Sequence, residues 1–408
     1  MKRNGKKGGS TPKKKKGNRF VNQLVSILKW VLRSVMVMLT LLMCLLLLAA
    51  AYSDYIDPTW WVVPSFLGIA YLGVLVLALL WAIILLVTRR WHCLMVLGIT
   101  ALLVLGPTLR LFPLHPFGPK KVLTDKWEGK VIEQIDTIRV MSFNTCIMGQ
   151  THLSRIKEKI PVIDVIRDSE ADIVCLQEYG FTLSKGGHTQ EQLRGELKKQ
   201  YAHYDYTPND KRKALGIALY SKYPIVKAQR VDTRKKGYFA AMYYQLDVNG
   251  RRVGLVNMHL KSNQIKIKDR LLYEEMMGHF EADSLNSIRQ GMMHSLADAF
   301  RKRAVEAKML HQFIAENHPS DMPLLICGDM NDTPISYCHH TLTLGGLQDT
   351  WAETGNGLGI TYREHRFWFR IDHMFHNKYL RALHSRVRRD VTYSDHYPIE
   401  ATFQLLPQ

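Results

Sequence analysis

The sequence lacks the cysteine patterns that mark zinc proteins and small disulfide scaffolds. It has six cysteines in 408 residues, and none forms a Cys-x-x-Cys pair or a Cys/His zinc spacing. No repeat of solenoid period is present. Two cysteines lie in long apolar runs, and we interpret the other four as small, mostly buried residues. A disulfide among those four stays open: Cys146, Cys175, Cys327 and Cys338.

Acidic residues are almost missing from the first 119 positions, where Asp54 and Asp57 stand against 14 Lys and Arg. The formal net charge of +19 is therefore concentrated near the N-terminus, and the remaining 41 basic and 34 acidic residues give the rest of the chain only +7. Membrane topology explains a basic tail before an apolar run better than nucleic-acid binding does. The rest of the chain also lacks stripes of interleaved basic and aromatic residues.

Three long apolar runs follow the basic tail. Residues 1–19 are mainly Lys, Arg, Gly, Asn and Ser, with too few apolar side chains to fold. The runs cover about 34–52, 62–87 and 91–109, each close to the ~20 residues that cross a hydrocarbon core. A cleaved signal peptide would have a shorter apolar core and no further spans. We therefore expect a transmembrane region of three helices within residues 20–112.

The charges beside these runs predict their orientation. Eleven Lys and Arg precede or open the first run, the next loop is acidic, and the loop after the second run carries Arg89 and Arg90. Basic loops stay in the cytoplasm, so the N-terminus is expected inside. Three spans then put the remaining chain on the outer side of the cytoplasmic membrane, periplasmic or extracellular. The alternative for the third run is a core helix broken at Pro107.

The rest of the chain alternates strand and helix patterns. Residues 113–137, with three prolines at their start, are expected to form a linker, and 138–408 a soluble domain. The mixed pattern predicts an α/β fold in which helices cover a β-sandwich. A hairpin is expected around Asn249-Gly250. Strands are expected over 138–143, 172–177, 215–220, 238–248, 251–259, 323–327, 367–375 and 398–403, and helices over 154–168 and, with a break near Gly291, 263–317.

Polar residues follow the ends of several predicted strands. Asn144, Glu178 and His259 each come directly after an apolar strand, and Gly328-Asp329-Met330-Asn331 follows another. We expect one polar rim over an apolar scaffold. Oxygen ligands of this kind suit Mg²⁺ or Mn²⁺ rather than zinc.

Six short motifs succeed one another along the chain: Ser142-Phe143-Asn144, Leu176-Gln177-Glu178, Met258-His259-Leu260, Gly328-Asp329-Met330-Asn331, Arg370-Ile371-Asp372 and Ser394-Asp395-His396. Each alone is weak, but together and in this order they resemble the endonuclease/exonuclease/phosphatase superfamily. That group includes pancreatic-type deoxyribonuclease, abasic-site endonucleases, bacterial sphingomyelinases and inositol polyphosphate phosphatases. The resemblance runs from about Ile138 to Phe403, and it implies a four-layer α/β-sandwich.

The resemblance also implies a metal site. Glu178 resembles the main metal-binding carboxylate of the family, and Asn144 resembles the amide that supports the metal and the phosphate. Asp395 resembles a further carboxylate on the metal side. The implied cofactor is Mg²⁺ or Mn²⁺.

The remaining motif residues resemble catalytic groups. His396 resembles the general base, with Asp372 as its orienting partner. An imidazole near its ordinary pKa of about 6.5 would take a proton from water at neutral pH. Asp329 and Asn331 resemble the pair that positions the attacking water and the transition-state oxygens. His259 resembles a histidine that steadies the phosphate or assists the leaving group.

The expected function is hydrolysis of a phosphodiester or phosphomonoester by direct attack of an activated water. The expected substrate is a lipid head group or a small phosphate, because the short connection over 361–370 disfavours duplex DNA. One alternative is a membrane-bound nuclease for extracytoplasmic nucleic acid. Another is a non-catalytic membrane binding module with the same fold. No family role matches His339, His340 or His373, which we interpret as structural.

Overall fold

The computed structural model describes most of the chain. The described residues are 15–118, 126–127, 130–131, 136–149, 161–180, 189–208, 215–232, 239–263, 282–364 and 367–407. They form two compact units. The first comprises Met1–Ala49 and Leu72–Val104, and the second comprises Ala50–Tyr71 and Leu105–Gln408. The second unit thus takes in segments that we had placed in the transmembrane region, whose bounds stay a prediction.

Apolar helices make up the first unit. Within α1 (Lys15–Ala51), the 32 residues Phe20–Ala51 are long and apolar enough to cross a membrane. Two bent helix pairs reach that length only if each pair is one span. They are α2 (Val63–Ile69) with α3 (Tyr71–Val87), and α4 (Trp91–Leu103) with α5 (Leu105–Leu111), and the short helices α2 and α5 belong to the second unit.

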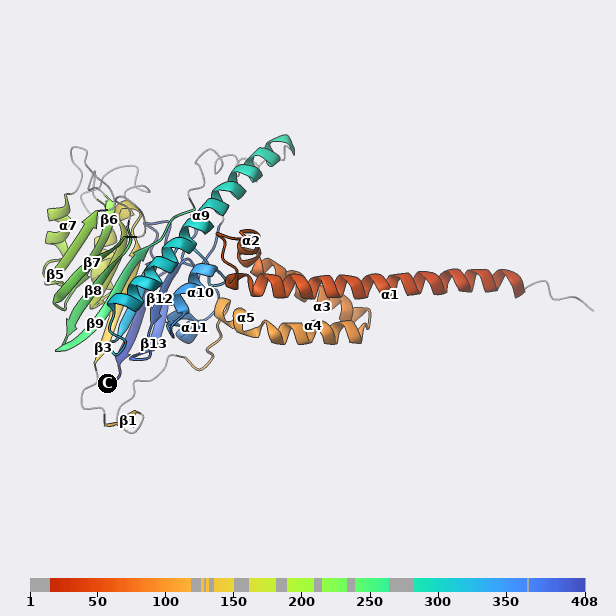
Figure 1. The fold of residues 1–408 in the computed structure, drawn as a ribbon, viewed down its shortest axis with the longest axis horizontal. Helices are drawn as coiled ribbons and strands as arrows, with labels where there is room; N and C mark the ends of the chain where they lie inside the picture. The colour runs from red at the N-terminus through yellow and green to blue at the C-terminus, as the bar shows by residue number, and fades with distance from the viewer. Residues whose placement is uncertain are drawn as a thin grey trace, which may run out of the picture. The chain divides into compact units, whose positions relative to one another are not determined.

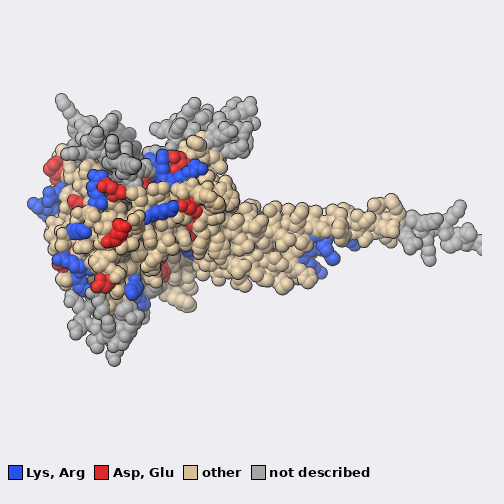
Figure 2. All heavy atoms as spheres, viewed as in Figure 1, with Lys and Arg blue, Asp and Glu red and all other residues tan. Residues whose placement is uncertain are grey.

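The surface of the first unit fits a lipid environment. On the face seen in Figure 2, its helices carry only a few Lys and Arg side chains on an otherwise uncharged surface. One polar pair inside the unit is hydrogen-bonded, since Trp81 Nε1 donates to Thr40 Oγ1 at 3.0 Å. One N-terminal helix is therefore suited to span a membrane, and the reading with three spans stays a prediction.

Two six-stranded mixed sheets form the centre of the second unit (Figure 1). The first contains β3 (Thr137–Asn144), β4 (Ile173–Gly180), β5 (His203–Pro208), β6 (Leu215–Ser221), β13 (Leu380–Val387) and β14 (Ile399–Leu405). The second contains β7 (Ile225–Asp232), β8 (Phe239–Val248), β9 (Arg251–His259), β10 (Leu324–Asp329), β11 (Gln348–Asp349) and β12 (Asp372–His376). Their strand orders are β13-β14-β3-β4-β6-β5 and β11-β12-β10-β9-β8-β7. Only β3 with β4 and β9 with β10 run parallel.

Three buried apolar clusters define the layers. One lies between the sheets, where Val140 and Leu219 share a cluster with Leu255 and Leu325. Along each strand, alternate residues face opposite sides, so the neighbouring Met141 packs outward. The predicted four-layer α/β-sandwich is confirmed. The first sheet is covered by α6 (Pro161–Asp168) and α7 (Gln190–Leu197), and the second by α9 (Ala282–Asn317) and α10 (Tyr337–Thr343).

Several element predictions are confirmed and two are wrong. The hairpin turn lies at Asn249-Gly250, whose φ angles of +52° and +86° are those of its expected type. The strand expected over 367–375 begins only at Asp372, because Phe369 instead pairs with Tyr362 as an isolated bridge. The expected break near Gly291 is absent from α9. One glycine costs a helix only about 1 kcal/mol, which packing along the apolar face offsets.

Some predictions lie outside the described residues. The helix expected over 154–168 is described from Pro161, and residues 264–281 of the expected helical segment are among those not described. All six cysteines are free, and of the four in the second unit only Cys146 is partly exposed.

Candidate active site

Strand register brings the polar motif residues to one edge of the sandwich. Because β9 and β10 are parallel, His259 pairs directly with Asp329, and antiparallel β12 places Asp372 on the other side of Asp329. Asn144 ends β3, which runs parallel to β4, the strand that carries Glu178. Strands β3 and β4 both touch β10 across the sandwich. The register alone therefore gathers these five residues.

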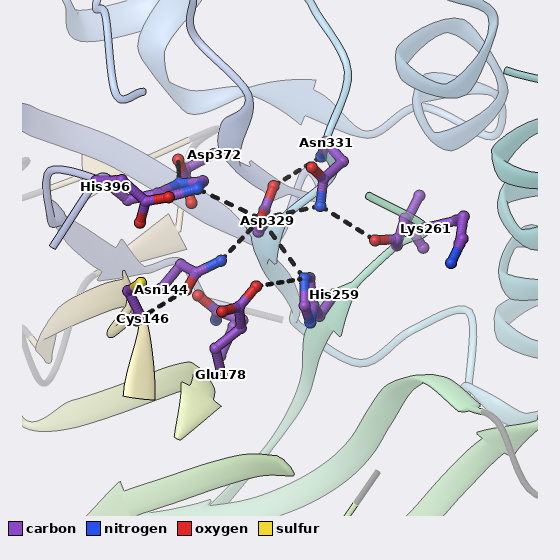
Figure 3. Close-up of polar contacts among 12 residues, drawn as sticks. Asn144, Cys146, Glu178, His259, Lys261, Asp329, Asn331, Asp372 and His396 are labelled. Carbon is purple, nitrogen blue, oxygen red and sulfur yellow. Dashed lines mark hydrogen bonds and ion pairs between the residues drawn. The ribbon is translucent and has the colours of Figure 1, made fainter. Parts of the chain in front are cut away.

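Asp329 lies at the centre of the polar cluster (Figure 3) and is only 1% exposed. Its Oδ2 accepts hydrogen bonds at 3.0 Å from Asn144 Nδ2 and Asn331 Nδ2, and its Oδ1 accepts one at 2.7 Å from the Asn331 backbone N–H. Burial raises the pKa of Asp329 to about 6, against the lowering effect of the neighbouring His396.

His396 and Asp372 form a buried pair beside Asp329. The His396 Nδ1 lies 2.8 Å from Asp372 Oδ2, and its Nε2 lies 3.8 Å from Asp329 Oδ2. Burial by itself would lower the pKa of His396, but the carboxylates of Asp372 and Asp329 outweigh it and hold the pKa well above 6.5. Without a metal ion, the pKa of His396 is thus shifted upward from its ordinary value, because two carboxylates flank one imidazole. A bound cation would oppose that effect.

His259 links the acidic groups on the other side of Asp329. Its Nε2 lies 3.6 Å from Glu178 Oε1 and 3.7 Å from Asp329 Oδ2, both too long for a hydrogen bond. This buried nitrogen has no hydrogen-bond partner within the described structure. It is thus available to donate to a ligand oxygen when it carries the proton.

The amide of Asn331 is used differently from our expectation. Its Nδ2 donates both to Leu260 O at 3.1 Å and to Asp329 Oδ2 at 3.0 Å. Both amide hydrogens are therefore engaged within the protein. In this geometry Asn331 holds the Asp329 carboxylate in place rather than pointing a free donor at a substrate.

Backbone distortion aims two of the site residues. Glu178 has a φ of +45° and lies at a register shift between Leu176 and Tyr179 in the β4–β6 pairing. Such a bulge turns one side chain out of the alternating pattern of the strand. Asn331 also has a positive φ, of +56°. Positive φ at residues other than glycine is costly and often accompanies functional sites.

Gly328 permits the close approach of β9 and β10 beneath Asp329. Its φ is +138°, and a Cβ added there would lie 2.0 Å from the backbone oxygen of Met258. No residue with a side chain fits this position without moving β9. The glycine of the Gly-Asp motif is therefore required by packing, and it fixes where Asp329 leaves the strand.

The residues that position Asp372 and His396 were not predicted from the sequence. Thr361 Oγ1 accepts the backbone N–H of Asp372 at 3.1 Å, and the ring of Tyr362 lies 5.1 Å from that of His396. Ser394 Oγ donates to Asn144 O at 2.8 Å and accepts from the His396 N–H at 3.1 Å. Ser394 was part of a motif, but no spacing pattern in the sequence marks Thr361 or Tyr362.

The cluster opens into a cavity of about 190 Å³. The structure brings all eight predicted site residues together here, and their roles stay predictions. Five line the cavity, and the other three contact those five. The lining residues are Glu178, Asp329, Asn331, Asp395 and His396, and the contacting residues are Asn144, His259 and Asp372.

The donor set fits a hard divalent cation. Carboxylates from Glu178, Asp329 and Asp395 line one cavity, and grouped carboxylates repel one another unless a cation balances them. Among the described residues, Asp329, Asp372 and His396 form one of two groups of acids and histidines whose ligand atoms lie within 4.8 Å of one another. Two members of that group, Asp329 and His396, line the cavity, but none of its members is a predicted metal ligand.

A second buried group lies near the site and is already neutralised. Asp349 accepts two bonds from Arg370 Nη1, at 2.9 and 3.0 Å, and its Oδ2 lies 2.8 Å from His339 Nε2. Burial lowers the pKa values of His339 and His373, and Arg370 acts in the same direction on both. A guanidinium in this position disfavours a metal ion. The geometry supports the structural interpretation of these histidines.

Residues 152–396 match the sequence model of the Endonuclease/Exonuclease/phosphatase family, which covers more than half of the chain. The chain belongs to this family. The predicted resemblance is thereby confirmed, and with it membership of a family of phosphoester hydrolases. A second model, described as a domain of unknown function, matches residues 33–111 of this family member. No curated protein matches the chain.

Several solved structures are similar to this family member. The catalytic domain of human nocturnin, with a bound sulfate anion, is 16% identical and covers 67% of this chain and 97% of its own, with a TM-score of 0.47. An endonuclease/exonuclease/phosphatase from Bacteroides vulgatus is 17% identical and covers 66% and 99%, with a TM-score of 0.44. D. rerio TDP2 complexed with single strand DNA product is 16% identical and covers 65% and 98%, with a TM-score of 0.45.

Proposed function

We propose that this chain is a membrane-anchored, divalent-metal-dependent phosphoesterase that hydrolyses a phosphodiester or phosphomonoester by direct attack of water. The observation that carries the proposal is the arrangement around Asp329. An oriented imidazole, His396, lies on one side of Asp329. On the other side lies His259, whose Nε2 has no hydrogen-bond partner among the described residues. Asp329 and His396 line one cavity whose carboxylates suit a metal ion, and His259 contacts two of those carboxylates.

In this mechanism His396 removes the proton from the attacking water. Asp372 holds the Nδ1 side of the ring, so that Nε2 faces Asp329 and the cavity. Asp329, held by Asn144 and Asn331, orients the water. His259 donates to a phosphate oxygen through its unbonded nitrogen. No serine or cysteine beside a base is needed, and no covalent intermediate forms.

The proposed metal ligands are Glu178 and Asp395, with the amide of Asn144 beside them. The amide oxygen of Asn144 also accepts the Cys146 N–H at 3.2 Å, which orients it. A bound Mg²⁺ or Mn²⁺ would neutralise charge that develops on the phosphate.

We further propose that the chain crosses the cytoplasmic membrane three times, with the catalytic unit on the outer side. Two ion pairs within the second unit support this arrangement. Asp54, in the acidic first loop, pairs with Arg110 at 2.7 Å, and Asp57 pairs with Lys308 of α9. In the proposed arrangement the first loop lies on the same side of the membrane as α9, which agrees with an odd number of spans before the linker.

The nuclease alternative has less support. On the face seen in Figure 2, Lys and Arg are interspersed with Asp and Glu over the second unit, without a continuous basic band. A duplex binder needs such a band to match the phosphate backbone. The non-catalytic alternative is disfavoured because every predicted catalytic and metal-binding residue is present and gathered in one place.

Hydrolysis by the purified full-length protein tests the proposal. With Mg²⁺ present, we expect turnover of a lipid phosphodiester, a nucleotide or a sugar phosphate to exceed that of duplex DNA. Fastest turnover of duplex DNA would favour the nuclease alternative. Turnover of none of these substrates, by folded protein and with either Mg²⁺ or Mn²⁺, would favour the binding module.

A further inference from the structure

The proposed chemistry uses only the polar part of the active-site cavity. The same cavity is also lined by side chains that have no role in hydrolysis. Some of these are polar, at Ser262, Asn263, Asp332 and Thr333. Others are apolar and come from three separated parts of the chain, among them Ile69, Met292, Leu296, Phe367 and Phe369. Because these apolar side chains line the same cavity as His396, the cavity suits a ligand with an apolar part.

Ile69 reaches the cavity from the segment between the first two apolar runs. Ile69 is the last residue of α2, and the first unit resumes three residues later, at Leu72. The segment is fixed on the catalytic fold by packing. The ring of Phe66 meets that of Phe300 edge to face at 5.2 Å. Gly68 lies so close to the backbone of Ile335 that an added Cβ would be 2.4 Å from its oxygen.

The connection from Tyr362 to Phe369 supplies an aromatic side of the cavity. The rings of Phe367 and Phe369 stack at 6.3 Å with an interplanar angle of 18°. Phe369 also pairs with Tyr362, whose ring contacts His396. Trp368, between the two phenylalanines, is 65% exposed. Aromatic surface therefore extends from the catalytic imidazole to the surface of the protein.

These surfaces are hydrated when the cavity holds only water, and a hydrocarbon group that displaced the water would gain the corresponding transfer free energy. With a bound cation, a phosphate fits the polar side, where His396 and the carboxylates of Glu178, Asp329 and Asp395 lie. The two requirements together describe an amphiphile with a phosphoester head.

We propose that the substrate is an amphiphilic phosphoester whose hydrocarbon group lies on Ile69, Phe367 and Phe369, with its phosphate at Asp329 and His396. Ile69 is then a specificity-determining residue, contributed by the segment that adjoins the apolar helices. This inference rests on the proposed function and adds the substrate class to it. A membrane lipid and a free amphiphile share this chemistry.

The test measures binding rather than turnover. Methyl-, butyl- and hexylphosphonate, which are water-soluble and contain no phosphoester bond, are titrated into full-length protein with Mg²⁺ by calorimetry. Each buried methylene contributes a factor of up to about four, so we expect Kd to fall at least ~10-fold from methyl to hexyl. In Ile69→Ala the hexyl-to-methyl ratio should shrink at least ~3-fold, because the wall loses three carbons.

Val226→Ala is the matched control. Val226 is an exposed apolar residue on β7, does not line the cavity, and should leave both the ratio and the activity unchanged. The ratio is taken within one preparation, so partial misfolding of a variant does not alter it. Equal binding of the three phosphonates, beside hydrolysis of a small phosphoester, would overturn the inference and leave the proposed function intact. Absence of hydrolysis of every phosphoester would overturn both.

Two further substrates distinguish the sources of the amphiphile. A diacyl phosphodiester in vesicles that contain the protein is compared with its soluble dihexanoyl analogue. Faster hydrolysis in the vesicles supports a membrane lipid, and faster hydrolysis of the soluble analogue supports a free amphiphile. Hydrolysis of neither, where a phosphoester without a hydrocarbon group is hydrolysed, would contradict the proposal.

Discussion

Eight side chains carry the proposed chemistry, and the order of motifs in the sequence was enough to predict all of them. Residue types at strand ends could be read directly, because strand ends on one edge of a sheet meet in space. The sequence could not show how each side chain is used. The amide hydrogens of Asn331 are taken by Leu260 and Asp329, and the pKa of His396 is raised by two carboxylates that come from other strands.

Substitution of the catalytic pair tests its role. We expect His396→Ala to lower kcat by about 10²–10⁴-fold, the usual contribution of a general base. Asp372→Asn should also lower kcat, because an amide no longer fixes the tautomer that presents Nε2 to water. The measurement is steady-state turnover of a small phosphoester, with the fold checked by circular dichroism.

His384→Ala is a matched control, because His384 is an exposed histidine on β13, away from the cavity. It should retain normal turnover. Near-normal kcat in folded His396→Ala protein would remove this residue from the mechanism.

At the scale of elements, pairing register decides which residues meet. The alternating pattern predicted most strands, but the connection before β12 is irregular because Arg370 is buried against Asp349 rather than turned to one face of a strand. That ion pair joins residues 21 positions apart in the sequence, so a local sequence pattern could not predict it. The long α9 shows the opposite case, where tertiary packing keeps a glycine inside a continuous helix.

The buried His373 on β12 makes stability depend on pH. Burial and the charge of Arg370 hold its pKa well below 6.5, so the folded protein keeps it neutral while the unfolded chain takes up a proton below about pH 6.5. This contribution to stability is present above that pH and is lost as pH falls. As the pH falls below about 6.5, protonation of His373 in the unfolded chain should raise the unfolding equilibrium constant by up to about tenfold per pH unit.

Urea unfolding of the full-length protein at pH 7 and pH 5 measures the effect. His373→Gln should be less stable than wild type at pH 7, because the contact with Phe375 and the bond to Asp332 O change. It should lose less stability between the two pH values. His384→Gln, at an exposed site, should keep the wild-type pH dependence. An unaltered pH dependence in His373→Gln would contradict the role given to burial.

At the scale of the whole molecule, the sequence predicted a basic tail, apolar helices and an α/β-sandwich in this order. It did not predict that residues 50–71 belong to the second unit. A segment that faces lipid and a segment that packs on protein have the same apolar composition. The contact between Phe66 and Phe300 could therefore not be predicted from the sequence. This segment is the part of the chain that the further inference depends on.

Reporter fusions test the proposed orientation. Alkaline phosphatase, which is active only outside the cytoplasm, should be active when fused after Gln408 and inactive when fused after Arg90. The first site follows three proposed spans and the second follows two. The reverse pattern of activities would overturn the three-span arrangement.

The central claim is that the cavity around Asp329 is a metal-dependent hydrolytic site. Removal and return of the metal tests it most directly. Full-length protein is assayed on its best phosphoester substrate after EDTA treatment, and again after Mg²⁺ or Mn²⁺ is added in excess. We expect activity to disappear and then return in wild type, and Glu178→Ala to need a higher metal concentration for half-maximal rate. Full activity in EDTA, or identical metal dependence in wild type and Glu178→Ala, would contradict the account.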